Sequence, residues 1–139
     1  MEEMIIGEEK KYPSLLGAEP IEKAKAIYMS LYNKKARNIK VFVAKGKTEI
    51  TDYVVIATGT SSTHVKALAG EVEYQMDLRE VKVDNFEGRD NGAWIVLDYS
   101  SVMVHVMSRE SREFYDLEKL FDGAQELDLR PAEDESENN

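Results

Sequence analysis

The chain of 139 residues contains no cysteine, only three prolines and one tryptophan, and no long apolar run. Without cysteine it can form no disulfide framework, no thiolate zinc site and no cysteine nucleophile. A membrane-spanning helix needs about 18 or more consecutive, mostly apolar residues, so we predict no membrane span. The lack of cysteine is compatible with a reducing compartment, and we expect the protein to be cytoplasmic.

The sequence also lacks the excess of basic residues that a non-specific nucleic-acid binder needs. It holds 27 acidic and 18 basic residues, for a formal net charge of −9. The two ends carry this acidity, with −3 in residues 1–19 and −6 in residues 122–139. Between them, residues 20–66 carry +6 and residues 67–121 carry −6. We therefore expect no direct DNA binding, and a neutral domain whose halves differ in charge.

These shifts in composition divide the chain into three segments. Residues 20–121 form one predicted domain with enough apolar residues for a core. Residues 122–139 are acidic and poor in apolar residues, so they cannot bury enough surface to offset chain entropy, and we predict a disordered tail. Residues 1–19 are interrupted by glycine and proline and are expected to be a mobile tail. They lack the apolar core of a secretion signal and the Arg-rich composition of a transit peptide.

The predicted domain alternates between helical and strand periodicity. Helical spacing of apolar residues predicts a helix over residues 20–33 and another after Gly59, with Ser61 or Ser62 as its N-cap. Apolar runs predict strands, at residues 39–43, 52–58, 81–83, 94–99 and 102–107. Ser108 is expected to cap a last helix with an apolar side of four residues, namely Phe114, Leu117, Leu120 and Phe121. We predict an α/β layer fold with a mixed β-sheet of about five strands flanked by helices.

Two glycine-containing motifs invite a phosphate-binding interpretation. Gly46-Lys47-Thr48 matches the end of a P-loop, but Val41 stands where that motif requires glycine, and a strand rather than a helix follows. We interpret this motif as a turn between strands.

The second motif, Gly59-Thr60-Ser61-Ser62, lies between a buried strand and a helix, where backbone N–H groups can bind an anion. A nucleotidyltransferase-like phosphoryl-transfer enzyme is therefore an alternative function. That chemistry needs paired carboxylates that hold a divalent metal, and the candidate strands offer only the single acids Asp84 and Asp98. We expect no catalytic residue, no cofactor and no metal, since the two histidines, His64 and His105, are not spaced as a ligand pair.

The strand around Trp94 is a candidate interaction surface. Alternation places Trp94, Val96 and Asp98 on one side of it, and Tyr99 on the other. An exposed aromatic residue beside an acid is typical of a protein–protein hot spot. Alternatively, Trp94 belongs to the core and Asp98 to a turn, and the spacing leaves both interpretations open.

Three blocks of sequence together resemble the Iojap family of ribosomal silencing factors (RsfS). The first is Asp52-Tyr53-Val54-Val55-Ile56-Ala57-Thr58-Gly59-Thr60-Ser61-Ser62 with His64-Val65-Lys66-Ala67. The second is Trp94-Ile95-Val96-Leu97-Asp98-Tyr99 with Val102 to Val106. The third is Glu110 and Arg112 with Tyr115-Asp116-Leu117-Glu118-Lys119-Leu120. The resemblance extends from about Ile21 to Phe121.

This resemblance implies a regulatory protein rather than an enzyme. Members bind the fourteenth ribosomal protein of the large ribosomal subunit, at the face that meets the small subunit. They thereby block subunit association and repress translation when nutrients are scarce. The resemblance further implies a nucleotidyltransferase-like layer fold without catalysis, and a homodimer when the protein is free.

Five residues match the partner-binding face of the family: Trp94, Asp98, Tyr99, Ser100 and Val102. Trp94 and Tyr99 would supply buried anchor area, and Asp98 an acceptor for Arg or Lys. The charge of −6 over residues 67–121 suits a basic ribosomal protein. Because Trp94 and Tyr99 alternate to opposite sides, both could contact one partner only near a sheet edge or turn. Ser100-Ser101 also departs from the Gly-Asp-like turn of the family, which weakens the route to a primed hairpin turn.

Overall fold

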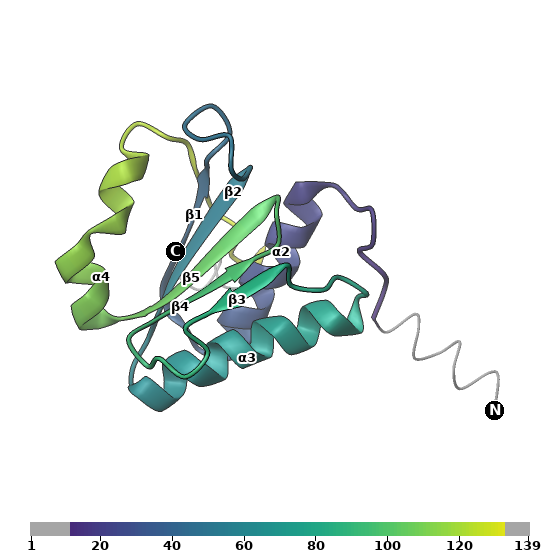
Figure 1. The fold of residues 1–139 in the computed structure, drawn as a ribbon. Coiled ribbons are helices and arrows are strands. Elements are labelled where there is room, and N and C mark those ends of the chain that lie inside the picture. The colour runs from purple at the N-terminus through teal and green to yellow at the C-terminus, as the bar shows by residue number, and fades with distance from the viewer. Residues whose placement is uncertain (1–11, 133–139) are drawn as a thin grey trace.

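A six-stranded mixed sheet forms the centre of the protein in a computed structural model that describes residues 12–132 (Figure 1). The strand order is β3-β4-β5-β2-β1-β6. The central pair, β2 with β5, is parallel, and every other neighbouring pair is antiparallel. The strands are β1 (Arg37–Val43), β2 (Tyr53–Gly59), β3 (Asn85–Glu87), β4 (Trp94–Asp98), β5 (Val102–Ser108) and β6 (Glu126–Leu127). The predicted α/β class is confirmed, with one strand more than expected.

Helices cover both faces of this sheet. Helices α2 (Pro20–Asn33) and α3 (Ser62–Leu78) lie on one face, and α4 (Arg109–Tyr115) lies on the other, followed by the 3-10 helix η1 (Leu117–Phe121) (Figure 1). Ser61 is the N-cap of α3, because its Oγ accepts a hydrogen bond of 3.1 Å from the His64 N–H. Within the part of the chain that the structure describes, no helix is long and apolar enough to cross a bilayer.

The core accordingly has two parts, one on each side of the sheet. The larger part lies under α2 and α3, where the predicted apolar stripe of α3 is fully buried, through Val65, Leu68, Ala69, Val72 and Met76. The smaller part joins Phe42, Ile56 and Met107 to Leu117 and Phe121 of η1. The Phe42 and Phe121 rings stack with their centroids 5.3 Å apart. Each fully buried apolar side chain contributes about 1.5–3 kcal/mol to folding, so both layers stabilise the sheet.

The last helical segment differs from its prediction as one continuous amphipathic helix. Helix α4 ends at Tyr115, because Asp116 adopts a left-handed conformation with φ 45°. The chain then continues as η1, which does not extend the helical period of α4. Phe114 and Leu120 are consequently 80% and 70% exposed. The prediction that these two residues face the core is wrong, whereas Leu117 and Phe121 do pack on the sheet.

The predicted strand at residues 81–83 is also wrong. Val81 is buried because it closes the end of α3, where its N–H donates to the carbonyl oxygen of Met76 at 2.9 Å. The strand begins later, at Asn85, and pairs antiparallel with β4. The alternation of Val81 and Val83 therefore reflected burial under a helix end rather than a strand.

The acidic segment that begins at residue 122 contributes the edge strand β6. Leu127 pairs with Val41 of β1, and the Val43 N–H donates to the Gln125 carbonyl at 2.8 Å. Leu127 and Leu129 also pack against the larger core. The prediction of disorder does not hold for residues 122–132, and the remainder of that predicted tail, like residues 1–11, lies outside the described residues.

The first described residues also contact the folded domain. The Leu15 N–H donates to the carbonyl oxygen of Arg79 at 2.9 Å, and the Leu15 side chain packs against the larger core. This contact ties residues near the start of the chain to the end of α3.

Two truncations test the role of β6. Ending the chain after Phe121 removes the pairing with β1 and the burial of two leucines, so we expect the free energy of unfolding to fall by about 2 kcal/mol. Ending it after residue 132 keeps both contacts and is expected to leave stability within about 0.5 kcal/mol of the full chain. Urea unfolding of the three proteins measures this. Equal stability of all three would show that β6 does not stabilise the domain.

Candidate partner-binding face

The alternation of β4 sends its side chains to two different environments. Ile95 and Leu97 are fully buried beneath α2 and α3. Trp94, Val96 and Asp98 lie on the opposite face and are partly exposed. This face is covered only in part, because α4 contacts β5 and β2 while η1 packs over β1 and β2. The outer half of the sheet, formed by β4 and β3, therefore presents the predicted aromatic residue and acid on one side.

Trp94 is held in place by two neighbours on this face. Its indole Nε1 donates a hydrogen bond of 3.0 Å to Nδ1 of His105 on β5. Its ring packs against Tyr115 of α4, with centroids 4.9 Å apart. Because Nδ1 accepts this hydrogen bond, the imidazole carries its proton on Nε2. His105 is only 9% exposed, and burial lowers its pKa from 6.5 to about 4. A neutral His105 thus fixes the orientation of Trp94.

Asp98 and Ser100 meet at the hairpin turn that joins β4 to β5. The Tyr99 N–H donates to the Val102 carbonyl at 2.9 Å, which confirms the predicted two-residue turn. Ser100 takes the left-handed conformation with φ 66°. Its N–H donates to Oδ1 of Asp98 at 2.8 Å, and its hydroxyl donates to Oδ2 of Asp84 at 2.5 Å. The turn therefore brings two carboxylates together around one serine.

Asp84 is a member of this turn that sequence reasoning missed. The sequence pattern identifies Asp84 only as a single acid beside the strand predicted at residues 81–83. The observed register pairs Asn85 with Asp98, and the Asp84 N–H donates to the Asp98 carbonyl at 2.8 Å. To predict this pairing, the strand would have to be placed at residues 85–87. A strand of three residues has no clear periodicity in the sequence, so it could not be placed there.

Tyr99 and Val102 lie on the inner side of the same turn. They are 3% and 0% exposed, so neither side chain presents surface to a partner in this conformation. The Tyr99 hydroxyl is buried without a hydrogen-bond partner among the described residues. Burial, followed by the charges of Glu73 and Asp77, raises the pKa of Tyr99. Of the five predicted residues, the structure brings together Asp98 and Ser100 on the surface, with Trp94 at the other end of β4.

Two exposed aromatic residues of α4 extend the surface beyond Trp94. Tyr115, which contacts Trp94, is 56% exposed, and Phe114 is 80% exposed. Their rings meet edge to face with centroids 5.0 Å apart. Helical periodicity predicts Phe114 in the core, so no sequence signal indicates this arrangement. Trp94, Phe114 and Tyr115 form one aromatic cluster, and Asp84, Asp98 and Ser100 form an acidic turn.

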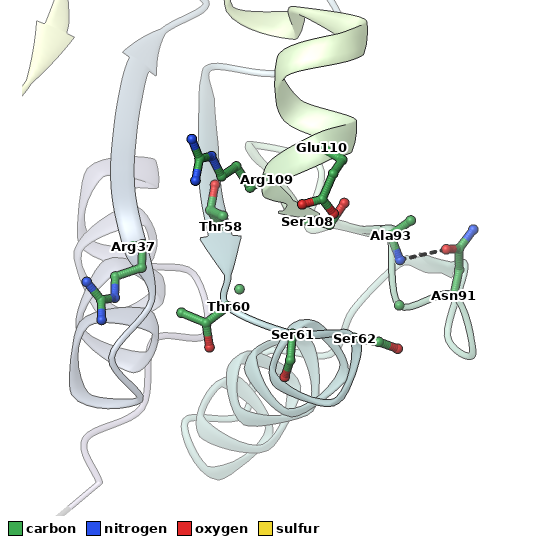
Figure 2. A pocket seen from close by; sticks show the side chains of 12 residues that line it. Arg37, Thr58, Thr60, Ser61, Ser62, Asn91, Ala93, Ser108, Arg109 and Glu110 are labelled. Carbon is green, nitrogen blue, oxygen red and sulfur yellow. Dashed lines mark hydrogen bonds between the residues drawn. The ribbon is translucent and has the colours of Figure 1, made fainter.

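A cavity of about 700 Å³ lies at the carboxyl ends of β2 and β5 (Figure 2). It contains the predicted turn from Gly59 to Ser62, together with Arg37, the loop from Asn91 to Ala93, and the start of α4. Glu110 is the one carboxylate in this lining. Asp98 and Ser100 are at the other end of β4, so the acid pair that phosphoryl transfer would need is not in this cavity. Among residues 12–132, no group of three His, Asp or Glu side chains is placed to hold a metal ion.

The protein is a mixed α/β protein with a helical layer on each face of its sheet and this surface on one of them. Comparison with known proteins identifies the family to which such a protein belongs. The family model "Ribosomal silencing factor during starvation" (RsfS) matches residues 18–139. The chain belongs to this family, as its three sequence blocks predicted.

The chain is similar to the ribosomal silencing factor RsfS of Bacillus subtilis, with 35% identity over 97 residues, covering 70% of this chain and 82% of the relative. It is 39% identical over 87 residues to RsfS of Haemophilus influenzae, covering 63% of this chain and 85% of the relative. A crystal structure of a Chromobacterium violaceum protein superimposes with a TM-score of 0.73 at 32% identity, covering 82% of this chain and 91% of that one.

The buried His105 predicts a dependence of stability on pH. Between its ordinary pKa of 6.5 and its native pKa of about 4, the unfolded chain binds a proton that the native protein does not. Stability therefore falls as the pH decreases through this window. From pH 7 to about pH 4.5 the loss from this one residue is about 2 kcal/mol.

His105→Gln keeps an acceptor for the Trp94 indole but removes the titrating group. We expect its free energy of unfolding to fall by about 2 kcal/mol less than that of the wild type over the same pH range. Urea unfolding followed by the fluorescence of Trp94, the one tryptophan of the chain, measures both proteins. An identical pH dependence in the two proteins would contradict the assignment.

Proposed function

We propose that this protein binds the large ribosomal subunit through its fourteenth ribosomal protein, blocks association with the small subunit and so represses translation. Its membership of the ribosomal silencing factor family supports this role. The observation that carries the proposal is the pairing of an aromatic cluster, at the edge of the cover given by α4, with an acidic turn at the other end of β4. In this proposal the protein acts without catalysis in the cytoplasm, and it is a homodimer when free.

The acidic turn supplies the electrostatic part of this surface. Asp84 and Asp98 accept hydrogen bonds from Ser100, and neither forms an ion pair with a basic residue in the described chain. Their charge is thus available to a partner. Arg or Lys of a basic protein would gain charge-assisted hydrogen bonds there, which fix the register of the complex. Ser100 holds both acids in place before binding, which reduces the entropy cost of ordering them.

The aromatic cluster supplies the apolar part. Trp94 lies four residues before Asp98 on the same face, about 13 Å away along the strand. Aromatic anchors near the centre of an interface contribute much of the affinity, with charged groups around them. Trp94, partly covered by Tyr115 and oriented by His105, has the rigidity that such an anchor needs.

Tyr99 and Val102 have a supporting role in the proposal rather than direct contact. Both are buried directly beneath the turn that carries Asp98 and Ser100. Their packing holds the turn against the larger core. Substituting either residue would change the interface through the position of the acids.

The charge of Asp98 provides the main test. We expect Asp98→Lys to weaken binding to purified large subunits by about 2–5 kcal/mol, because it replaces an acceptor with a like charge facing a basic partner. Glu22→Lys makes the same charge change at an exposed position of α2, on the face covered by helices. We expect that control to bind like the wild type.

Co-sedimentation with large subunits measures these affinities, and thermal unfolding checks that the variants remain folded. A second assay adds small subunits and measures the fraction of joined ribosomes, which the wild type is expected to lower and Asp98→Lys to lower less. The proposal fails if the wild type does not sediment with large subunits. The assignment of binding to this surface fails if both variants bind large subunits more weakly than the wild type by the same amount.

A further inference from the structure

We propose that Asn91, in the loop between β3 and β4, is a site of spontaneous deamidation in the folded protein, and that its isoaspartate product loosens the start of α4. Asparagine is among the thermolabile residues. Asn91 is the one asparagine of the chain that glycine follows. Because glycine has no Cβ, its backbone nitrogen is the least crowded by its own side chain. The site plays no part in the proposed ribosome contact.

Three hydrogen bonds hold the loop that contains Asn91. The Asn91 N–H donates to the carbonyl oxygen of Gly88 at 2.7 Å. Oδ1 of Asn91 accepts a hydrogen bond of 2.8 Å from the Ala93 N–H (Figure 2). The carbonyl oxygen of Ala93 in turn accepts a hydrogen bond of 2.8 Å from the Ser108 N–H. Asn91 itself is exposed, so its side chain is held in one arrangement and is open to water.

The hydrogen bond of the Asn91 side chain brings the reacting atoms together. It folds the side chain back on its own backbone, as in an Asx turn. The ring of atoms that it closes contains both Cγ of Asn91 and the backbone nitrogen of Gly92, which are the two atoms that must bond. The Ala93 N–H donates to the oxygen on which negative charge develops as that bond forms. A donor in this position stabilises the transition state.

The backbone nitrogen of Gly92 is free to react. Among residues 12–132, the Gly92 N–H donates no hydrogen bond. A Cβ at this position would collide with the Ser62 side chain. The fold therefore requires glycine after Asn91, and the same glycine leaves the nitrogen unshielded.

The reaction needs water and no other partner. The Gly92 nitrogen loses its proton and bonds to Cγ of Asn91, while the bond from Cγ to Nδ2 breaks and the side-chain amide leaves as ammonia with one added proton. Water then opens the resulting cyclic imide. Attack at Cγ restores the original main chain with aspartate at position 91. Attack at the main-chain carbonyl gives isoaspartate, whose main chain continues through Cβ and Cγ. No atom is oxidised or reduced.

The two products fit the loop differently. Aspartate keeps an oxygen that can accept the hydrogen bond from the Ala93 N–H, so it preserves the loop. Isoaspartate lengthens the main chain by one carbon atom, next to a glycine that has no room for even a Cβ beside Ser62. The added atom must displace Ala93, whose carbonyl pairs with the N–H of Ser108, the N-cap of α4. The isoaspartate product therefore weakens the attachment of α4 to β4.

Mass spectrometry of the full chain, incubated at neutral pH, tests the site. We expect isoaspartate in the tryptic peptide of residues 90–109 and one added negative charge per modified chain. Asn91→Gln is expected to slow deamidation at this position about tenfold or more, because the longer side chain must close a larger ring. Asn85→Gln is the matched control, since it removes an exposed asparagine of β3 that phenylalanine follows. We expect this control to deamidate at Asn91 like the wild type.

The same chain in urea keeps the Asn91-Gly92 sequence but loses the loop. We expect the native chain to deamidate at Asn91 at least as fast as the unfolded chain does. Slower deamidation in the native chain would overturn the proposal that the fold prepares this site. Equal rates of modification at Asn85 and Asn91 in the native wild type would overturn it as well.

Hydrogen exchange tests the effect on α4. Asn91→Asp carries the added charge without the longer main chain, so it separates the two consequences of deamidation. We expect faster amide exchange at Ser108 in the aged wild-type chain than in freshly prepared Asn91→Asp, and a lower melting temperature. Equal exchange and equal melting temperatures would overturn the proposed loosening of α4. None of these results depends on binding to ribosomes.

Discussion

The parallel pairing of β2 with β5 is the constraint on which the rest of the structure depends. All seven residues of β2 pair in register with β5, from Tyr53 with Val102 to Gly59 with Ser108. Because the two strands are parallel, both end at the same edge of the sheet, and both are followed by helices. The first of these helices, α3, turns to one face and α4 turns to the other (Figure 1). The pair thereby creates the two cores, and it places the cavity where the strands end.

The unequal cover of the two faces leaves the proposed partner surface accessible. Helices α2 and α3 cover one face along its length, and this face buries Ile95, Leu97 and Tyr99. On the other face the short α4 and η1 cover the sheet around β5, β2 and β1, and Trp94 lies at the boundary of that cover. An exposed strip of sheet is normally a liability. Here it carries an oriented indole at one end and two ordered carboxylates at the other, which is the composition of a specific interface rather than of a packing defect.

Strong periodicity in the sequence predicted the fold well, and weak periodicity did not. The run from Asp52 to Thr58 predicted β2 because a central strand is buried on both faces, and the stripe of α3 was predicted because its buried residues follow one helical face. The strands β3 and β6 have three and two residues, too few to show a period. Phe114 was misplaced because the left-handed Asp116, a tertiary feature, ended the helix that periodicity would continue. At the candidate site, strand alternation correctly predicted that Trp94 and Asp98 share one face of the sheet. The position of Asp84 beside Asp98 could not be predicted in this way, because it follows from the register between β3 and β4, which only the folded sheet defines.

We propose that the half of the sheet from Trp94 to Ser100, which α4 covers only at its edge, is the surface that meets the large ribosomal subunit. A cryo-electron microscopy structure of this protein bound to large subunits tests that claim most directly. We expect Trp94, Asp98 and Ser100 to lie within contact distance of a basic ribosomal protein, with α2 and α3 facing away. A complex in which the outer surfaces of α2 and α3 make the contact, and this half of the sheet faces solvent, would contradict it.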